Sequence, residues 1–201
     1  MIETVRTFLT NILKSLYTPF LFAIVLAVCI LFFVMYTNKY KDLGWSRRII
    51  NSIKDGKNKF LRENAFRRFF YFSFIVVLIL FKTLLNREMW INPVANVIGT
   101  WSFHKKDGTF TTEIIENVIL FIPLILFLFL FLETTSKKVT NFLSIMGRAI
   151  LISFFFSFSI EMFQLFLRLG TWQLSDICFN TIGGMVGGII YYLSVVVRRR
   201  V

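Results

Sequence analysis

The stretch 149-AILISFFFSFSIEMFQLFL-167 decides the fold. Glu161 is its only charged residue, and Phe, Leu and Ile fill most of the other positions. A helix rises about 1.5 Å per residue, so roughly 20 apolar residues cross a hydrocarbon core of about 30 Å. A segment of this length and composition predicts a transmembrane helix, with lipid in place of water around most of its surface.

Four further apolar runs predict the same structure. The chain is 56% hydrophobic with 26 Phe, and these residues fall in blocks instead of alternating with polar ones as the core of a soluble protein would. The first block is expected to stay in the mature protein, because its apolar stretch and leader are long and no small-x-small cleavage site follows it. We expect an all-α integral membrane bundle of about five transmembrane helices. Besides Ala149–Leu167, the expected spans are Pro19–Tyr36, Phe69–Leu85, Ile114–Leu132 and Ile177–Val197.

The basic residues predict the orientation of these spans. The formal net charge is +12, which in a soluble protein would indicate nucleic acid. Here most Lys and Arg fall between the first and second spans, between the third and fourth, and after the fifth. These three regions share one face, and the positive-inside rule makes that face cytoplasmic, with the N-terminus outside and the C-terminus inside. The basic loop has little aromatic interleaving, so it favours anionic lipid headgroups over nucleic acid and includes a short interfacial helix.

Two parts are expected along the chain. Residues 1–68 comprise the first transmembrane helix and the basic cytoplasmic loop, and residues 69–201 comprise a four-helix membrane domain. Cys29 and Cys178 do not form a disulfide framework or a metal-ligand spacing, and His104 has no triad or zinc spacing around it. We expect no metal and no cofactor.

The few polar residues at membrane depth are the candidates for function. At 100° per residue, the polar residues of the fourth span fall within an arc of about 80°. A lone carboxylate at the bilayer centre costs roughly 2.5 to 3.5 kcal/mol, so this stripe should face other helices. Glu161 is expected in the outer half of the membrane with a partner, within reach of Arg168. The stripe comprises Ser153, Ser157, Glu161, Gln164 and Arg168.

The neighbouring spans also carry polar residues at their outer ends. In the fifth span a polar pair one turn apart is followed by two small-xxx-small pairs, Gly183 with Gly187 and Gly184 with Gly188, against which we place the fourth span. In the third span Pro123 interrupts the hydrogen-bond ladder. Six residues are therefore candidate ligand-binding residues, and no catalytic residue is assigned. They are Asn117, Glu161, Gln164, Arg168, Asp176 and Asn180.

Two interpretations of this convergence stay open at this point. The six groups bond one another and only fix the packing of the bundle. Alternatively, they form a small outward-facing site in which a buried carboxylate beside amide donors binds a cation, holds a proton or orients a polar headgroup. Glu161 favours the second interpretation.

The strings 116-ENVILFIPL-124 and 160-IEMFQLFLRLGTWQLSDICFNTIGG-184 resemble the VanZ-like family. In that family an Asn begins a helix containing a Pro, a Glu and a Gln lie one turn apart in the next helix, and an Asp, an Asn and a Gly follow. The family usually carries Gly-Arg just before the Asp, whereas here the nearest Arg is Arg168, slightly early. The first span and the basic loop look like an addition to this core. The matching residues are Asn117, Pro123, Glu161, Gln164, Asp176, Asn180 and Gly183.

The resemblance implies a bacterial cytoplasmic membrane protein linked in some relatives to low-level resistance to teicoplanin. Its partners would be membrane lipids and either a lipoglycopeptide or a lipid-linked cell-wall precursor, recognised at an outward polar site. Three alternatives stay open. They are a lipid-headgroup enzyme using Glu161 or Asp176 as general base with Arg168 on an anion, a small proton-coupled transporter carrying its proton on Glu161, and a structural partner of the envelope machinery without a ligand. The oligomeric state is left open.

Overall fold

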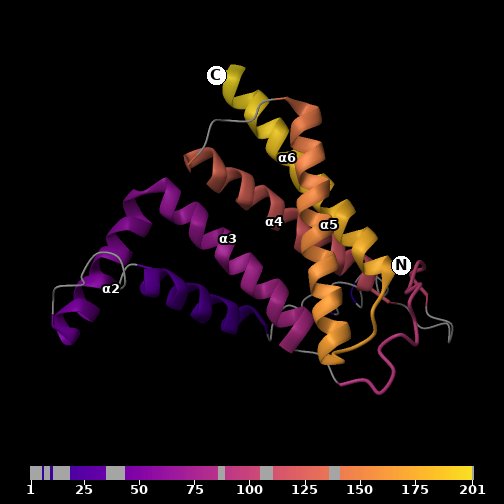
Figure 1. Cartoon of the computed structure of the whole chain (residues 1–201). Coiled ribbons are helices and arrows are strands. Elements are labelled where there is room, and N and C mark those ends of the chain that lie inside the picture. The colour runs from indigo at the N-terminus through magenta and orange to yellow at the C-terminus, as the bar shows by residue number, and fades with distance from the viewer. Residues whose placement is uncertain are drawn as a thin grey trace.

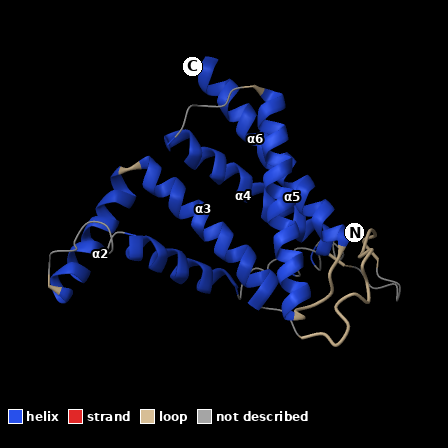
Figure 2. Ribbon diagram, in the orientation of Figure 1, coloured by secondary structure: helices blue, strands red, loops and turns tan. Residues whose placement is uncertain are grey.

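The regular structure of the described chain is entirely helical, which confirms the predicted all-α class (Figure 2). The computed structural model describes residues 6, 10, 19–34, 44–85, 89–104, 111–135 and 141–200. Along the chain come an apolar helix Pro19–Val34, α2 (Trp45–Arg62), α3 (Asn64–Leu80), the π-helical turn η1 (Phe81–Leu85), α4 (Glu113–Thr135), α5 (Phe142–Leu167) and α6 (Leu174–Arg200).

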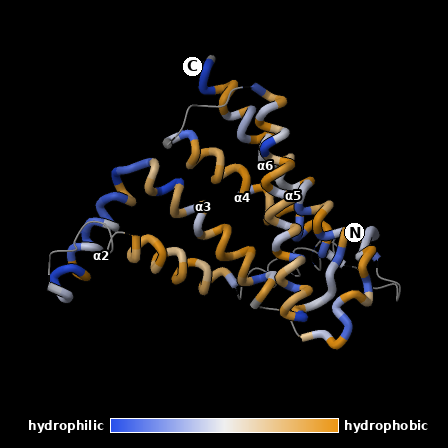
Figure 3. The backbone as a smooth tube through the Cα atoms, in the orientation of Figure 1, coloured by the Kyte–Doolittle hydropathy of each residue, from blue (hydrophilic) through white to orange (hydrophobic). Residues whose placement is uncertain are grey.

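Among the described residues, four helices are long and apolar enough to cross a membrane. They are Asn64–Leu84, Glu113–Thr134, Phe142–Leu167 and Leu174–Arg199. The first predicted span corresponds to the shorter apolar helix Pro19–Val34, and the residues on either side of it lie outside the described part of the chain. Figure 3 shows the hydrophobic character of these helices beside the mostly hydrophilic α2. The chain is a multi-pass membrane protein.

The glycines of α6 decide how the last three helices pack. A methyl group at Gly183 would lie 2.3 Å from the carbonyl oxygen of Val118, and one at Gly187 would lie 2.4 Å from that of Ile122. This pair therefore lets the backbones of α6 and α4 meet directly. The second pair, Gly184 and Gly188, faces α5 instead, through Ser153, Met146 and Ala149.

The sequence placed the fourth span against both glycine pairs, and this was wrong for the first pair. Adjacent residues of a helix point about 100° apart, so two consecutive small-xxx-small pairs face two different neighbours. In the structure α4 occupies one side of α6 and α5 the other (Figure 1).

The two ends of the bundle differ in charge. At one end, Glu133 of α4 accepts from Arg68 of α3 at 3.4 Å and from Arg198 of α6 at 3.1 Å. We call this the basic end. The predicted basic loop does contain a helix, α2, which joins α3 at this end and lies on the opposite side of the molecule from α6 (Figure 1). Its interfacial position stays a prediction. The other end carries the segments 89–104 and 168–173 and is called the loop end.

The apolar helix Pro19–Val34 packs along α3. Ala23 is fully buried in the hydrophobic core with Ile79 of α3, and the rings of Phe20 and Phe74 meet edge to face with centroids 5.3 Å apart. This contact joins the Pro19–Val34 helix to the core that α3 shares with α4 and α5. The division of the chain at residue 68 into two parts stays a prediction.

Candidate functional site

The polar stripe of α5 is buried, and the rest of its surface is apolar. Glu161 and Gln164 are 2% and 1% exposed, while Phe155, Phe163 and Phe166 on other faces of the helix are exposed. Because a membrane offers no water to an unpaired carboxylate, each polar group here needs a partner from another segment.

Glu161 finds its partner in the turn that connects α5 to α6. Its Oε2 accepts the backbone N–H of Gln173 at 2.8 Å. The Gln173 side chain in turn donates to Thr171 Oγ1 at 2.7 Å. A buried carboxylate on the last turns of α5 therefore fixes the backbone of the segment 168–173 at the loop end.

Two amide side chains connect α6 to its neighbours. Asn117 of α4 donates through Nδ2 to Oδ1 of Asp176 at 2.9 Å, and Asn180 donates through Nδ2 to Oγ of Ser157 at 2.8 Å. Asp176 and Asn180 lie one turn apart on α6, so a single face of that helix bonds to α4 and α5.

Gln164 extends this network to the π-helical turn. Its Nε2 donates to the backbone carbonyl of Thr83 at 2.7 Å, while its buried Oε1 has no hydrogen-bond partner among the described residues. On the other side of η1, Lys82 Nζ lies 2.6 Å from Glu116 Oε2 of α4. Polar side chains thus link η1, α4, α5 and α6 in one layer. We call this layer the polar belt, comprising Lys82, Glu116, Asn117, Ser157, Glu161, Gln164, Asp176 and Asn180.

Arg168 stands apart from the belt. It ends α5 in the left-handed conformation with φ of 55°, and its side chain is exposed. Its carbonyl accepts the Trp90 N–H at 2.8 Å, next to a bridge between Met89 and Leu169. No ion pair joins Arg168 to Glu161 in the described structure, because the sharp turn carries the guanidinium out of the bundle.

A cleft of about 760 Å³ opens at the loop end. The segment 89–104 forms one side, held down by bonds from Trp172 N to Pro93 O at 2.8 Å and from Leu174 N to Val97 O at 2.9 Å. Gln173, whose backbone is held by Glu161, lines the other side. The lining residues are Trp90, Ala95, Asn96, Gly99, Thr100, Trp101, Ser102, His104, Glu113, Gly170, Thr171 and Gln173.

The sequence missed these cleft residues. Of the lining residues, only His104 was considered from the sequence, and only to note that no triad or zinc spacing surrounds it. The available signal is the Pro93 and Gly99 punctuation in the connection between the second and third spans, which is typical of irregular structure but does not indicate a cavity. Of the six predicted residues, the structure gathers Asn117, Glu161, Gln164, Asp176 and Asn180 in the belt under the cleft, and leaves Arg168 outside it.

A family model described as VanZ/LLP1 matches residues 20–196. The chain belongs to the VanZ/LLP1 family. Searches among curated proteins and among solved structures find no significant match. The VanZ/LLP1 match confirms the resemblance seen in the sequence and contains the complete polar belt, the cleft and nearly the whole Pro19–Val34 helix.

The position of Arg168 in this VanZ/LLP1 chain leads to a test. A non-glycine residue in the left-handed region destabilises the folded state by roughly 1–2 kcal/mol. Glycine removes this strain, but it also makes the unfolded chain more flexible, which offsets part of the gain in stability. Arg168→Gly is therefore expected to leave the free energy of unfolding unchanged or to raise it by up to about 1 kcal/mol, measured by titration with a denaturing detergent. A clear loss of stability would mean that the guanidinium has a structural partner. Arg168→Lys, which keeps the charge and the strained turn, is the matched control.

Proposed function

We propose that this VanZ/LLP1 protein contributes to low-level resistance to teicoplanin-type lipoglycopeptides. It would do so from the cytoplasmic membrane of a bacterium, by recognising an amphipathic or lipid-linked envelope molecule in the cleft at the loop end. The loop end would face outward. Support for this orientation comes from the basic residues of α2 and from Arg198 and Arg199 near the C-terminus, because cytoplasmic segments carry the excess of Lys and Arg.

The observation that carries the proposal is the mixed lining of the cleft. Indole rings of Trp90 and Trp101 stand beside His104, Glu113 and Gln173 in a cavity of about 760 Å³, a size typical of ligand sites. Aromatic side chains at the membrane boundary suit a molecule that is apolar at one end and polar at the other. A lipid-tailed glycopeptide and a lipid-linked wall precursor both have that character.

The six residues predicted from sequence would serve this cleft in three ways. Glu161 would position Gln173 at the cleft wall, and the other members of the polar belt would hold the helices beneath it. Arg168, exposed at the same end, would be free to meet an anionic group on the ligand. Since Glu161 and Asp176 are both more than nine-tenths buried and hydrogen-bonded, a role as general base or proton carrier would require the belt to open.

A purely structural role is the second candidate, and the bonding of the belt favours it. Asn117 bonds to Asp176 between α4 and α6, and Asn180 bonds to Ser157 between α6 and α5, as groups that only fix packing would. This role needs no ligand in the cleft. The two candidates therefore predict different effects of a cleft substitution on protection against teicoplanin.

Growth under drug tests the proposal. Cells lacking the gene, cells with the intact protein and cells with Trp101→Ala are compared under teicoplanin and under vancomycin at matched membrane abundance. Truncating an aromatic anchor in a binding site costs about 2 kcal/mol or more. We therefore expect the intact protein to protect more strongly against teicoplanin, and Trp101→Ala to lose most of that protection.

The control is Trp45→Ala, which removes an exposed indole from α2, away from the cleft. It should protect like the intact protein. Equal growth of all strains under teicoplanin would remove resistance from the function of this chain, and full protection by Trp101→Ala would favour the structural role.

A further inference from the structure

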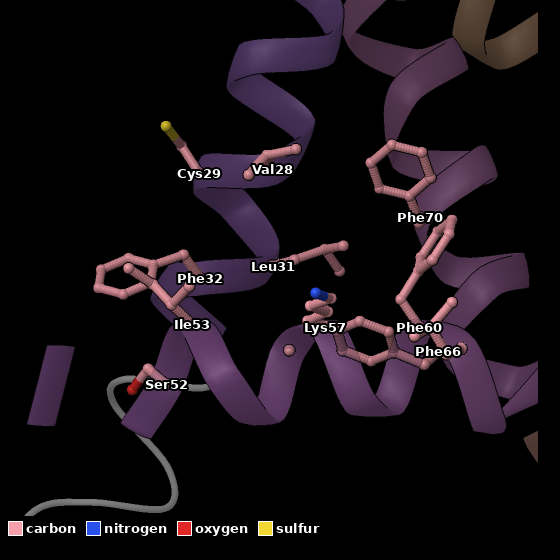
Figure 4. A pocket seen from close by; sticks show the side chains of 12 residues that line it. Val28, Cys29, Leu31, Phe32, Ser52, Ile53, Lys57, Phe60, Phe66 and Phe70 are labelled. Atoms are coloured by element: carbon pink, nitrogen blue, oxygen red, sulfur yellow. The ribbon is translucent and has the colours of Figure 1, made fainter. Parts of the chain in front are cut away.

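A second cavity lies at the other end of the molecule, and it differs from the cleft in chemistry. Its volume is about 650 Å³ and its walls are almost wholly apolar. We call it the groove. The Pro19–Val34 helix forms one wall, α2 the floor and the first turns of α3 the other wall, as Figure 4 shows for Leu31, Phe60 and Phe70. The groove and the cleft have no lining residue in common.

The amphipathic pattern of α2 creates this groove. Ile53, Gly56, Phe60 and Leu61 recur at helical spacing and line the cavity, while the basic residues other than Lys57 fall on the sides and back of the helix. Gly56 leaves open space, because a methyl group there would meet no atom within 4 Å. The helix thus presents an apolar floor to the groove and a mainly basic surface away from it.

One cation enters this apolar space. The Lys57 side chain rises from α2 toward Leu31 in Figure 4, and Lys57 makes no hydrogen bond or ion pair in the described structure. Around it, α2 carries Arg47, Arg48, Lys54, Lys59 and Arg62 against a single acid, Asp55. An ammonium group at the mouth of an apolar cavity is complementary to a ligand with an anionic head and an aliphatic tail.

The level of the groove in the membrane identifies the source of such a ligand. Phe66 and Phe70 belong to the first turns of the span Asn64–Leu84, so the groove opens where that helix enters the bilayer at the basic end. Phospholipid headgroups and the first part of their acyl chains lie at this depth. Basic side chains near a membrane surface favour anionic lipids by roughly 1 kcal/mol each.

We propose that the groove is a binding site for one anionic phospholipid of the surrounding membrane. One acyl chain lies between the Pro19–Val34 helix and α3, and the phosphate pairs with Lys57. Bound in this way, the lipid fills the space between α2 and the bundle and fixes the basic helix on the membrane. The site is independent of the cleft, so it stands or fails separately from the proposed resistance function.

The test uses a photoreactive benzoylphenylalanine at Phe32, which lines the groove, and at the neighbouring exposed Phe33, which does not. The full chain is reconstituted in vesicles of equal parts phosphatidylcholine and phosphatidylglycerol, irradiated and analysed by mass spectrometry of the intact protein. Because 1 kcal/mol is about a fivefold ratio, we expect phosphatidylglycerol adducts to exceed phosphatidylcholine adducts about fivefold at Phe32. At Phe33 the two lipids should react about equally.

Substitutions at Lys57 and Gly56 distinguish the effect of the Lys57 charge from the effect of the open volume of the groove, with Lys54→Gln as the control for charge. Lys57→Gln should reduce the ratio at Phe32 to that at Phe33, whereas Lys54→Gln, on a flank of the same helix, should preserve most of the preference. Gly56→Leu fills the groove and should lower the yield of both lipid adducts at Phe32 without changing Phe33, which also controls for folding. Equal adducts at both positions, no lipid adduct at Phe32, or an adduct with a second copy of the chain would overturn the proposal.

Discussion

Gly183→Ala in α6 is expected to lower the free energy of unfolding by about 1–3 kcal/mol, the usual cost of forcing extra volume into a packed interface. The added methyl group would lie 2.3 Å from the Val118 carbonyl oxygen and 3.0 Å from Phe121 Cβ. The first of these is a backbone atom of α4, which cannot move aside without shifting that helix. Gly187→Ala meets the Ile122 carbonyl oxygen at 2.4 Å and should cost a similar amount.

Unfolding in mixed micelles with increasing denaturing detergent measures both effects. The matched control is Gly147→Ala in α5, where a methyl group meets no atom within 4 Å. Replacing an unpacked helical glycine by alanine stabilises by roughly 0.5–1 kcal/mol, so this variant should be at least as stable as the parent. If Gly183→Ala behaved like Gly147→Ala, α4 and α6 would not be in backbone contact.

Glu161→Leu is expected to give the largest functional loss of any single change in the polar belt. Removing the carboxylate leaves the Gln173 N–H without the acceptor that now lies at 2.8 Å, and an unsatisfied buried donor costs about 1–3 kcal/mol. The segment 168–173 would lose its attachment to α5, and Gln173 and Thr171 would no longer be held at the cleft wall. We expect reduced stability together with loss of protection against teicoplanin.

Glu161→Gln distinguishes the charge of this group from its hydrogen bond. The amide oxygen can still accept the Gln173 N–H at nearly unchanged volume, so stability should stay close to that of the parent. Normal protection would then show that the hydrogen bond is sufficient, and lost protection at normal stability would show that the carboxylate charge or its proton is needed.

A change on the lipid-facing side of the same helix provides the reference for both variants. Ser159→Ala removes only a bond to the Phe155 carbonyl on the exposed side of α5, and it should be neutral. If Glu161→Leu were as stable and as protective as Ser159→Ala, Glu161 would not hold the wall of the cleft.

The elements that the sequence predicted best are those set by local composition. The run around Ser153 and Phe155 is too apolar for water and long enough for a bilayer, so its helix and its buried stripe follow from the cost of exposing polar groups to lipid. The same reasoning located the spans of α3, α4 and α6 and the basic helix α2. The helices α3, α4 and α5 begin one to seven residues earlier than predicted, because the backbone hydrogen bonds of a helix continue beyond the apolar run that the sequence pattern detects.

The prediction of the site was less complete. Helical spacing placed Glu161, Gln164, Asp176 and Asn180 on inward faces, and the structure buries all four. Glu161 was expected to have a partner and to lie within reach of Arg168. In the structure Glu161 accepts the backbone N–H of Gln173, while the left-handed turn at Arg168 leaves the Arg168 side chain exposed. Every residue except proline has a backbone N–H, so the residue types of a connecting turn do not show which N–H will bind a carboxylate.

The sequence by itself determined that this chain is helical, that it belongs in a membrane and that its scarce polar side chains must meet inside the bundle, since each of these follows from the cost of placing a residue in lipid. Only the tertiary structure decided that Gly183 contacts α4 and not α5, that Gln164 bonds to Thr83, and that residues 90–104 and 170–173 enclose a cleft. Those contacts depend on how all the helices rotate and pack against one another. The local sequence of each segment therefore does not predict which distant segment it meets.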